Sequence, residues 1–320
     1  MSLSAPAVIT PHLLRATDLG RDGILELLAE AAELRAALQA DPRAGLERLA
    51  GRSLVMLFEK PSLRTRVSFE IGIGKLGGQA VHLDHRTERL GVRESIGDYA
   101  RNLERWTDVV VARVFEHRTL EELARTSRVP VVNALSDRFH PCQALADLLT
   151  LADHGRAPGE CTIAYIGEGN NVCHSLMESV AIVGGRFLAV TPPSFRPDPG
   201  IERECRRLAE ASGAEIVCSD EVSAIAGADA IYTDTWFSMG DSADPAGVRD
   251  KRRVLEPYRV DAELMRIAGP QALFMHCLPA HRGEEVLDEV IDGPASVVFD
   301  QAENRMHAQN ALLVRLLRDR

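Results

Sequence analysis

The sequence predicts an α/β protein made of two doubly wound parallel-sheet domains joined by interdomain helices. Short apolar runs alternate with helical stretches along almost all of its 320 residues, a pattern typical of parallel strands covered by helices on both faces. Residues 153–160 form a polar stretch containing Gly and Pro, which marks a domain boundary. The length also suits about two domains, each with its own core.

The first half begins with a helical stretch over residues 22–40. Apolar, β-branched runs predict strands at 53–58, 79–83, 108–114 and 130–135. Helical stretches fill the intervals at 63–77, 95–106 and 118–127. A longer helix follows Pro141, since proline fits the first turn of a helix.

In the second half the alternation restarts. Strands are predicted at 161–166, 186–191, 215–218, 228–233 and 272–276. A last amphipathic helix is predicted from about Ala302 to Leu317. Residues 239–250 are polar and contain Gly, so we expect a loop with the composition of a mobile lid.

Composition narrows the class of protein. The net charge of −10 argues against nucleic-acid binding, for which a basic surface is expected. No apolar run reaches the length of a membrane span, and no secretory signal is recognisable at the N-terminus. Six cysteines without a C-x-x-C pair indicate buried free thiols in a reducing cytoplasm.

The most informative segment follows the first predicted strand. Ser62 is a good helix N-cap, and Leu63, Arg64, Thr65 and Arg66 follow it in the first turn. Cations are unfavourable there because backbone N–H groups and the helix dipole already make this end positive. An anion would compensate, and phosphate accepts from backbone, hydroxyl and guanidinium donors together. The alternative is a solvated basic turn.

Two further strand ends carry polar residues. Ligands of open parallel sheets bind beyond the carboxyl ends of the strands. Arg113 ends the third strand, although a lone arginine there is usually a surface group. After the fourth strand, His140 precedes Pro141 and Gln143 lies one turn into the helix. These two side chains could hold a small polar group, while a capping or core histidine is the alternative.

In the second half, Gly167-Glu-Gly-Asn-Asn171 follows a strand and opens a helix. A dinucleotide site is one interpretation, but Val172 stands where the third glycine belongs. The next strand also ends in Thr191-Pro192 without the ribose-binding acid. We therefore interpret the segment as a tight turn that presents Asn170 and Asn171.

Polar residues also follow the last two predicted strands. Asp234 comes directly after a strand and could pair with a substrate ammonium. His276 and Cys277 end the last strand, before a Leu278-Pro279 bond that could be cis. A zinc cluster of His276, Cys277 and His281 is a weak alternative, because no fourth ligand lies nearby.

Together these segments resemble the carbamoyltransferases, and most closely the ornithine carbamoyltransferases. The resemblance is collinear over essentially the whole chain. Its blocks are Ser62–Arg66, Arg113, His140–Gln143, Gly167–Asn171, Asp234 with Ser238–Gly240, His276–Pro279 and Glu303–Arg305. The Ser-Met-Gly and His-Cys-Leu-Pro blocks indicate the ornithine branch.

The resemblance implies transfer of a carbamoyl group from carbamoyl phosphate to the δ-amine of ornithine, giving citrulline and phosphate, with no metal or other cofactor. It places carbamoyl phosphate in the Ser62–Arg66 turn with Arg113 and, through a further arginine contact, Arg305. Arg64, Arg113 and His140 would polarise the carbamoyl oxygen. Gln143 and the backbone carbonyls of Cys277 and Leu278 would receive the carbamoyl amino group.

The resemblance also implies that Asn171, Asp234, Ser238 and Met239 hold ornithine, and that the loop after Met239 closes over it. Cys277 and Asp234 are candidates for handling the amine proton, as is the substrate phosphate. The domains would be 1–150 with the C-terminal helix at about 303–320 for carbamoyl phosphate, and 151–302 for ornithine. A cytoplasmic homotrimer, or a multiple of it, is expected.

The sequence departs from the commonest family pattern at two positions. Leu63 stands where many members have Thr, which removes a hydroxyl but leaves the backbone N–H. Arg89 stands where some members place a neutral or histidine side chain that reaches the neighbouring subunit's site. We expect Leu63 to cause a modest change in phosphate affinity. Arg89 leaves open which residue crosses the interface between subunits.

Three alternatives remain. The amine could be putrescine, an N-acylated ornithine or aspartate, although Asp234 favours a substrate with a free α-amino group. A nicotinamide-dependent dehydrogenase is disfavoured by the missing glycine and acid. A non-catalytic regulatory paralogue would keep the fold and bind anions.

Overall fold

The computed structural model describes residues 12–237 and 245–318. The chain divides into two compact units, which are residues 1–145 with 305–320, and residues 146–304. The helices α5 (Pro141–Asp153) and α11 (Val298–Leu317) each run through a boundary between the units. Among the described helices, none is both long and apolar enough to cross a lipid bilayer.

The first unit contains a parallel sheet with the strand order β2-β1-β3-β4. Its strands are β1 (Ser53–Phe58), β2 (Gln79–Asp84), β3 (Val109–Arg113) and β4 (Val131–Leu135). β1 pairs with β3 so that Phe58 lies opposite Arg113, and the carboxyl ends of these central strands therefore coincide. The strand order reverses between β1 and β3, which is where open α/β sheets bind ligands.

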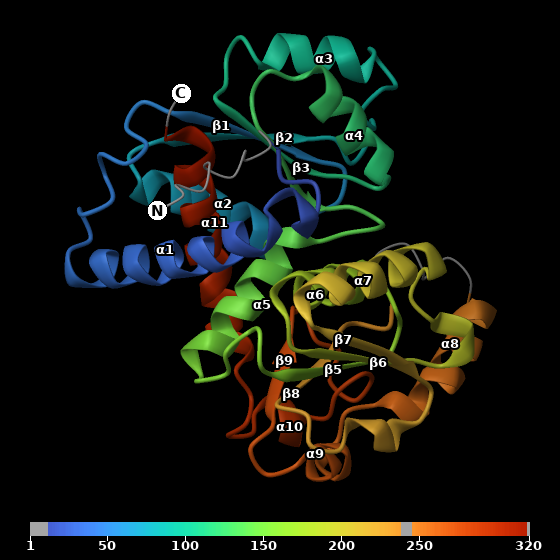
Figure 1. The fold of residues 1–320 in the computed structure, drawn as a ribbon. Coiled ribbons are helices and arrows are strands. Elements are labelled where there is room, and N and C mark those ends of the chain that lie inside the picture. The colour runs from blue at the N-terminus through green and yellow to red at the C-terminus, as the bar shows by residue number, and fades with distance from the viewer. Residues whose placement is uncertain (1–11, 238–244, 319–320) are drawn as a thin grey trace. The chain divides into compact units, whose positions relative to one another are not determined.

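Helices α1 (Gly20–Ala40), α2 (Leu63–Lys75), α3 (Ile96–Leu103) and α4 (His117–Thr126) complete this unit with the second part of α11. Val55, Leu57, Val110 and Leu120 are among the buried residues of one of its cores. The last helix, red in Figure 1, contacts the first helix, blue, because Arg315 Nη1 donates to the carbonyl of Gly23 at 3.1 Å. The C-terminal segment is thus an integral part of the first unit.

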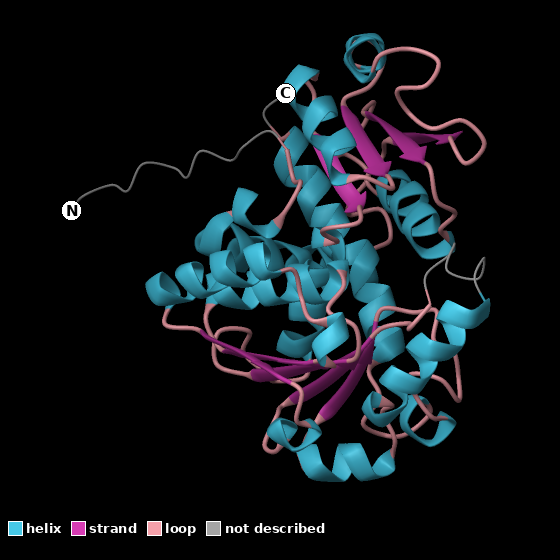
Figure 2. Ribbon diagram, turned by 90° about the vertical axis from the view of Figure 1, so that its right-hand side faces the viewer, coloured by secondary structure: helices cyan, strands magenta, loops and turns pink. Residues whose placement is uncertain are grey.

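The second unit contains a parallel sheet with the order β7-β6-β5-β8-β9. The strands are β5 (Thr162–Ile166), β6 (Arg186–Val190), β7 (Glu215–Ser219), β8 (Ala230–Thr233) and β9 (Leu273–His276). Figure 2 shows helices on both faces of this sheet. The order reverses between β5 and β8, so the segments after Ile166 and Thr233 lie at its switch point.

Helices of the second unit connect these strands. They are α6 (Asn171–Val183), α7 (Pro199–Ser212), α8 (Pro245–Leu255), α9 (Ala262–Ala268) and α10 (Asp288–Ile291), with short 3-10 turns at Pro193–Phe195, Val222–Ile225 and Glu256–Tyr258. Ile166, Ile231, Phe274 and Val286 are among the buried residues of its core. The doubly wound parallel architecture predicted from the sequence is confirmed.

Two boundaries differ from the sequence prediction by four residues or more. The last helix begins at Val298, four residues before the expected start, and Asp300 stabilises its first turn through the helix dipole. The expected loop over 239–250 is wrong for its second part, because α8 begins at Pro245, a residue suited to a helix start. Residues 238–244 of that stretch lie outside the described residues.

Candidate functional site

The turn after β1 has the predicted cap. The Ser62 hydroxyl accepts from the Thr65 N–H at 3.2 Å and so starts α2. The Thr65 side chain is buried, whereas Leu63 is 74% exposed and Arg64 is half-buried. Arg66 is exposed and forms an ion pair with Glu70 at 3.1 Å, one helical turn further on. Arg64 and Thr65 are therefore the side chains of this turn that are positioned for an anion.

Arg305 connects two other predicted site residues, Thr65 and Gln143. It lies on α11 and is only 3% exposed, within the first unit. Its Nη1 donates to Gln143 Oε1 at 2.6 Å, and its Nη2 donates to Thr65 Oγ1 at 3.3 Å. A buried guanidinium thus ties the start of α2 to the start of α5. A carbonyl oxygen accepts two hydrogen bonds, so this contact is compatible with Gln143 also receiving a substrate N–H.

His140 is buried beside two cations. Burial first, and then the charges of Arg305 and Arg113, hold the pKa of His140 well below its usual range. The imidazole is therefore neutral near pH 7 and can donate a hydrogen bond without adding charge. Pro141 begins α5 directly after it, as the sequence predicted. The first unit thus combines neutral and cationic donors at the carboxyl ends of its strands.

A buried carboxylate that the sequence analysis did not identify anchors the segment containing Arg89. Glu59, at the end of β1, is 4% exposed and accepts from the N–H groups of Leu90 at 3.0 Å and Phe115 at 2.8 Å. The Arg89 guanidinium lies 4.1 Å from the centre of the Phe115 ring. Within this chain, Arg89 is therefore held close to the segment that follows Arg113.

In the second unit, the backbone of the turn after β5 requires glycine at two positions. Gly167 has a φ of +123°, and a Cβ on Gly169 would lie 2.3 Å from the backbone nitrogen of Pro197. The next residues start α6, where Asn170 Oδ1 accepts from the N–H groups of Val172 and Cys173. These glycines therefore serve the turn itself, as predicted.

Asp234 is held by donors from several segments. Asn170 Nδ2 donates to Oδ2 at 2.7 Å, while the Cys277 thiol donates to Oδ1 at 2.9 Å and the Thr235 N–H donates to Oδ1 at 2.8 Å. Burial raises the pKa of Tyr165 well above its usual range, which keeps its hydroxyl protonated as a donor to Asn170 Oδ1 at 3.0 Å. Asn171, the predicted ligand, is half-buried at the first position of α6.

Asn170 was missed as a site residue because the sequence assigned substrate binding to its neighbour. Its role depends on a contact across 64 residues, and the only local signal is its fitness as an N-cap. Ser238 and Met239 lie outside the described residues. The Leu278-Pro279 bond is cis, as the sequence allowed.

Two groups of side chains in the described residues have potential metal-ligand atoms within 4.8 Å of one another. One contains Asp234, His276 and Cys277, and the other contains His281, Glu284 and Glu285. The zinc cluster considered from the sequence is therefore not assembled as such, because His281 lies in a different group from His276 and Cys277. Hydrogen bonds already engage Cys277 with Asp234 and Nδ1 of His276 with Leu278.

Known proteins match both halves of the chain. Residues 11–153 match the carbamoyl-P binding domain, and residues 159–316 the Asp/Orn binding domain, of aspartate/ornithine carbamoyltransferase. An ornithine carbamoyltransferase of Shewanella oneidensis is 50% identical over 95% of this chain and 99% of its own length. One of Methanoculleus marisnigri is 46% identical over 94% of both chains.

Solved structures agree with these matches. The ornithine carbamoyltransferase of Pyrococcus furiosus superimposes with a TM-score of 0.90 at 42% identity, covering 97% of each chain. That of Thermus thermophilus gives 0.84 at 40% identity over 98% of this chain and all of the other. The dehydrogenase alternative is therefore wrong. By its two domain matches and its near-full-length relatives, this chain belongs to the aspartate/ornithine carbamoyltransferase family.

Proposed function

We propose that this chain transfers the carbamoyl group of carbamoyl phosphate to the δ-amine of L-ornithine, giving L-citrulline and phosphate. The observation that carries the choice of amine is the Asp234 carboxylate, which Asn170, Cys277 and the Thr235 amide hold at the switch point of the second sheet. A fixed carboxylate suits a substrate with a free α-ammonium group. Relatives about half identical to this chain bear the name ornithine carbamoyltransferase.

The proposed roles divide between the units. The first unit binds carbamoyl phosphate through Ser62, Leu63, Arg64, Thr65 and Arg66 with Arg89, Arg113, His140, Gln143 and Arg305. The second unit binds ornithine through Asn171, Asp234, Ser238 and Met239, and supplies the backbone carbonyls of Cys277 and Leu278 to the carbamoyl amino group. The domain limits of 1–150 with 303–320, and 151–302, remain our assignment for these two roles.

In the proposed reaction, the uncharged δ-amine attacks the carbamoyl carbon, an oxyanion develops on the carbamoyl oxygen, and phosphate leaves. Arg64, Arg113 and neutral His140 donate to that oxygen, and each such donor is worth about 10²–10³ in rate. The amine gives up one proton, for which Asp234, Cys277 and the departing phosphate are the acceptors to test. Holding both substrates in line removes roughly 7–11 kcal/mol of the barrier.

The first experiment offers carbamoyl phosphate with ornithine, putrescine, N-acetylornithine or aspartate in separate assays. We expect citrulline from ornithine at a far higher kcat/KM than any other product. A preference for another amine would contradict the assignment of Asp234, Ser238 and Met239 to ornithine. The assignment of the carbamoyl phosphate residues would be unaffected. No product from any amine would favour a regulatory paralogue.

We also propose a homotrimer, or a multiple of it, that works in the cytoplasm. Leu63, Val67 and Ile71 form an exposed apolar stripe on α2, with exposures of 74%, 41% and 50%. Their spacing of four residues places them on one helix face, and apolar stripes of this kind mark sites of association. A second copy of the chain is the occupant that the family resemblance favours. Ile71→Asp should lower the mass measured by light scattering, and an unchanged mass would remove this stripe from the interface.

A further inference from the structure

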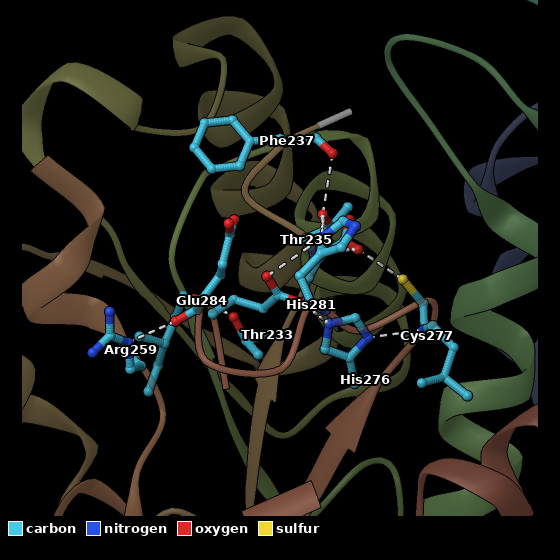
Figure 3. Close-up of polar contacts among 12 residues, drawn as sticks. Thr233, Thr235, Phe237, Arg259, His276, Cys277, His281 and Glu284 are labelled. Carbon is cyan, nitrogen blue, oxygen red and sulfur yellow. Dashed lines mark hydrogen bonds and ion pairs between the residues drawn. The ribbon is translucent and has the colours of Figure 1, made fainter. Parts of the chain in front are cut away.

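A buried carboxylate lies between two histidines in the segment that follows β9. Glu285 is fully buried, and Oε1 lies 3.3 Å from His276 Nε2. The same oxygen accepts from the backbone N–H of His281 at 2.5 Å, and Oε2 lies 3.8 Å from His281 Nδ1. Figure 3 shows both histidines, with Cys277 beside His276 and Thr235 beside His281. Glu285 therefore contacts the end of β9 and the segment that follows it, and reaches the segment after β8 through His281.

A hydrogen bond from the Leu278 backbone fixes the tautomer of His276. His276 Nδ1 accepts from the Leu278 N–H at 2.8 Å, so this nitrogen carries no hydrogen. The ring hydrogen is then on Nε2, which faces the carboxylate. Leu278 has a φ of +58°, a left-handed conformation that is unfavourable for a leucine. The hydrogen bond to His276 therefore helps to hold Cys277 and Leu278 in their strained turn.

The contact with His281 leads to the other turn. His281 Nδ1 lies 2.7 Å from Thr235 Oγ1, and this hydroxyl donates to the carbonyl of Phe237 at 3.1 Å. A hydroxyl has one hydrogen, so Thr235 accepts from His281 Nδ1–H. Thr235 follows Asp234 directly, and Phe237 is the last described residue before 238–244.

We propose that Glu285 is a positioning residue that orders both turns through the two histidines. This inference rests on the proposed roles of Asp234, Cys277 and Leu278. A carboxylate suits this position because it accepts from every donor that faces it, whereas an amide must present its own N–H₂ to one of them. In Glu285→Gln, retention of the bond from the His281 amide would leave the amide oxygen facing His276 Nε2 and point the new N–H₂ at His281 Nδ1–H. His281 would then change to the Nε2–H tautomer and lose the Thr235 hydroxyl as an acceptor.

The test compares Glu285→Gln with Glu284→Gln. Glu284 is the matched control because its carboxylate, although within 4.8 Å of the His281 ring, forms its ion pair with Arg252 at 2.7 Å. We expect Glu285→Gln to lower kcat with ornithine by about 10- to 100-fold, as for small displacements of reacting groups. Carbamoyl phosphate affinity, measured by calorimetry, should stay within about twofold in both variants. Glu284→Gln should keep wild-type kcat.

A second readout does not depend on turnover. In ¹⁵N-histidine-labelled protein, His281 should be the Nδ1–H tautomer in the wild type and the Nε2–H tautomer in Glu285→Gln, with the signal assigned from His281→Asn. This result would support the proposal even if the wild type preferred another amine. An unchanged tautomer, or an unchanged kcat in a folded Glu285→Gln variant, would overturn it.

His281→Asn provides a milder variant, because that side chain is 47% exposed and its loss threatens folding less. It removes the ring contacts with Thr235 and with Glu285 Oε2 but keeps the backbone N–H that donates to Glu285 Oε1. We expect the KM for ornithine to rise by about threefold or more while carbamoyl phosphate affinity is retained. If His281→Asn changed only the melting temperature, Glu285 would not act on the Asp234 turn.

Discussion

Replacement of Arg305 by methionine separates the chemical from the structural role of the buried guanidinium. The change removes the donors to Gln143 Oε1 at 2.6 Å and Thr65 Oγ1 at 3.3 Å. A hydrogen bond to a charged group contributes about 1.5–3 kcal/mol. The variant also avoids the desolvation penalty of the buried cation, which is several kcal/mol. These terms oppose each other, so we expect unfolding free energy to change by less than about 2 kcal/mol.

The rate should respond much more strongly. Loss of one preorganised donor at a developing charge costs about 10²–10³ in rate. In addition, Arg305 contributes to holding the pKa of His140 low, so its removal should move that pKa back towards the usual range. As pH falls, the loss of activity should therefore begin at a higher pH in Arg305→Met than in the wild type. The assays are citrulline formation across pH and denaturant unfolding of the same preparations.

The control is Arg315→Met, the same substitution on the same helix. Arg315 donates to Gly23 O and pairs with Glu26 on α1, away from the predicted site residues. Arg315→Met should lower the free energy of unfolding and leave kcat unchanged. The reasoning is refuted if folded Arg305→Met retains kcat/KM within about threefold of the wild type, or if both variants lose rate equally.

Three further predictions concern the two substrate sites and pH. Arg64→Ala should reduce turnover by about 10²-fold or more in a folded protein, and near-normal turnover would remove Arg64 from the mechanism. Asp234→Asn should impair ornithine use more than carbamoyl phosphate binding, as compared by KM and calorimetry; equal damage to both would contradict its role. The folded-state pKa of His140 is lowered, so the unfolded chain takes up this proton first as pH falls through about 6.5. Between about pH 7.5 and 5.5 the wild type should therefore lose more stability than His140→Gln, by up to about 1.4 kcal/mol. Equal losses in denaturant unfolding would show that His140 does not titrate in this way.

Local signals explain what the sequence predicted well. The run at 53–58 is apolar throughout, and β1 has the same bounds because all but its first residue are buried. Ser62 and Pro141 start α2 and α5 as predicted, since capping and proline effects act within one turn. In contrast, the start of α11 was placed four residues late, because Val298 has no preceding cap residue of the usual type.

The missed residues act through other residues over long sequence separations. Asn170 orients Asp234 across 64 residues, and Glu59 receives the Phe115 amide across 56. Glu285 has no periodicity or motif that marks its burial, and its partners are defined only once β9 and the following loop fold together. Single-sequence patterns report local preferences, so such pairs become visible only in the structure.

The discontinuity of the first unit has a consequence for biosynthesis. Residues 1–145 leave the ribosome before residues 146–304, but their partners at 305–320, including buried Leu312 and Leu313, are made only after those residues. At roughly 5–20 residues per second, the interval lasts on the order of ten to thirty seconds. During that time the nascent first unit lacks both part of its apolar core and the arginine that ties α2 to α5. A chain that terminates early would therefore have an incomplete first unit, however well residues 146–304 had folded.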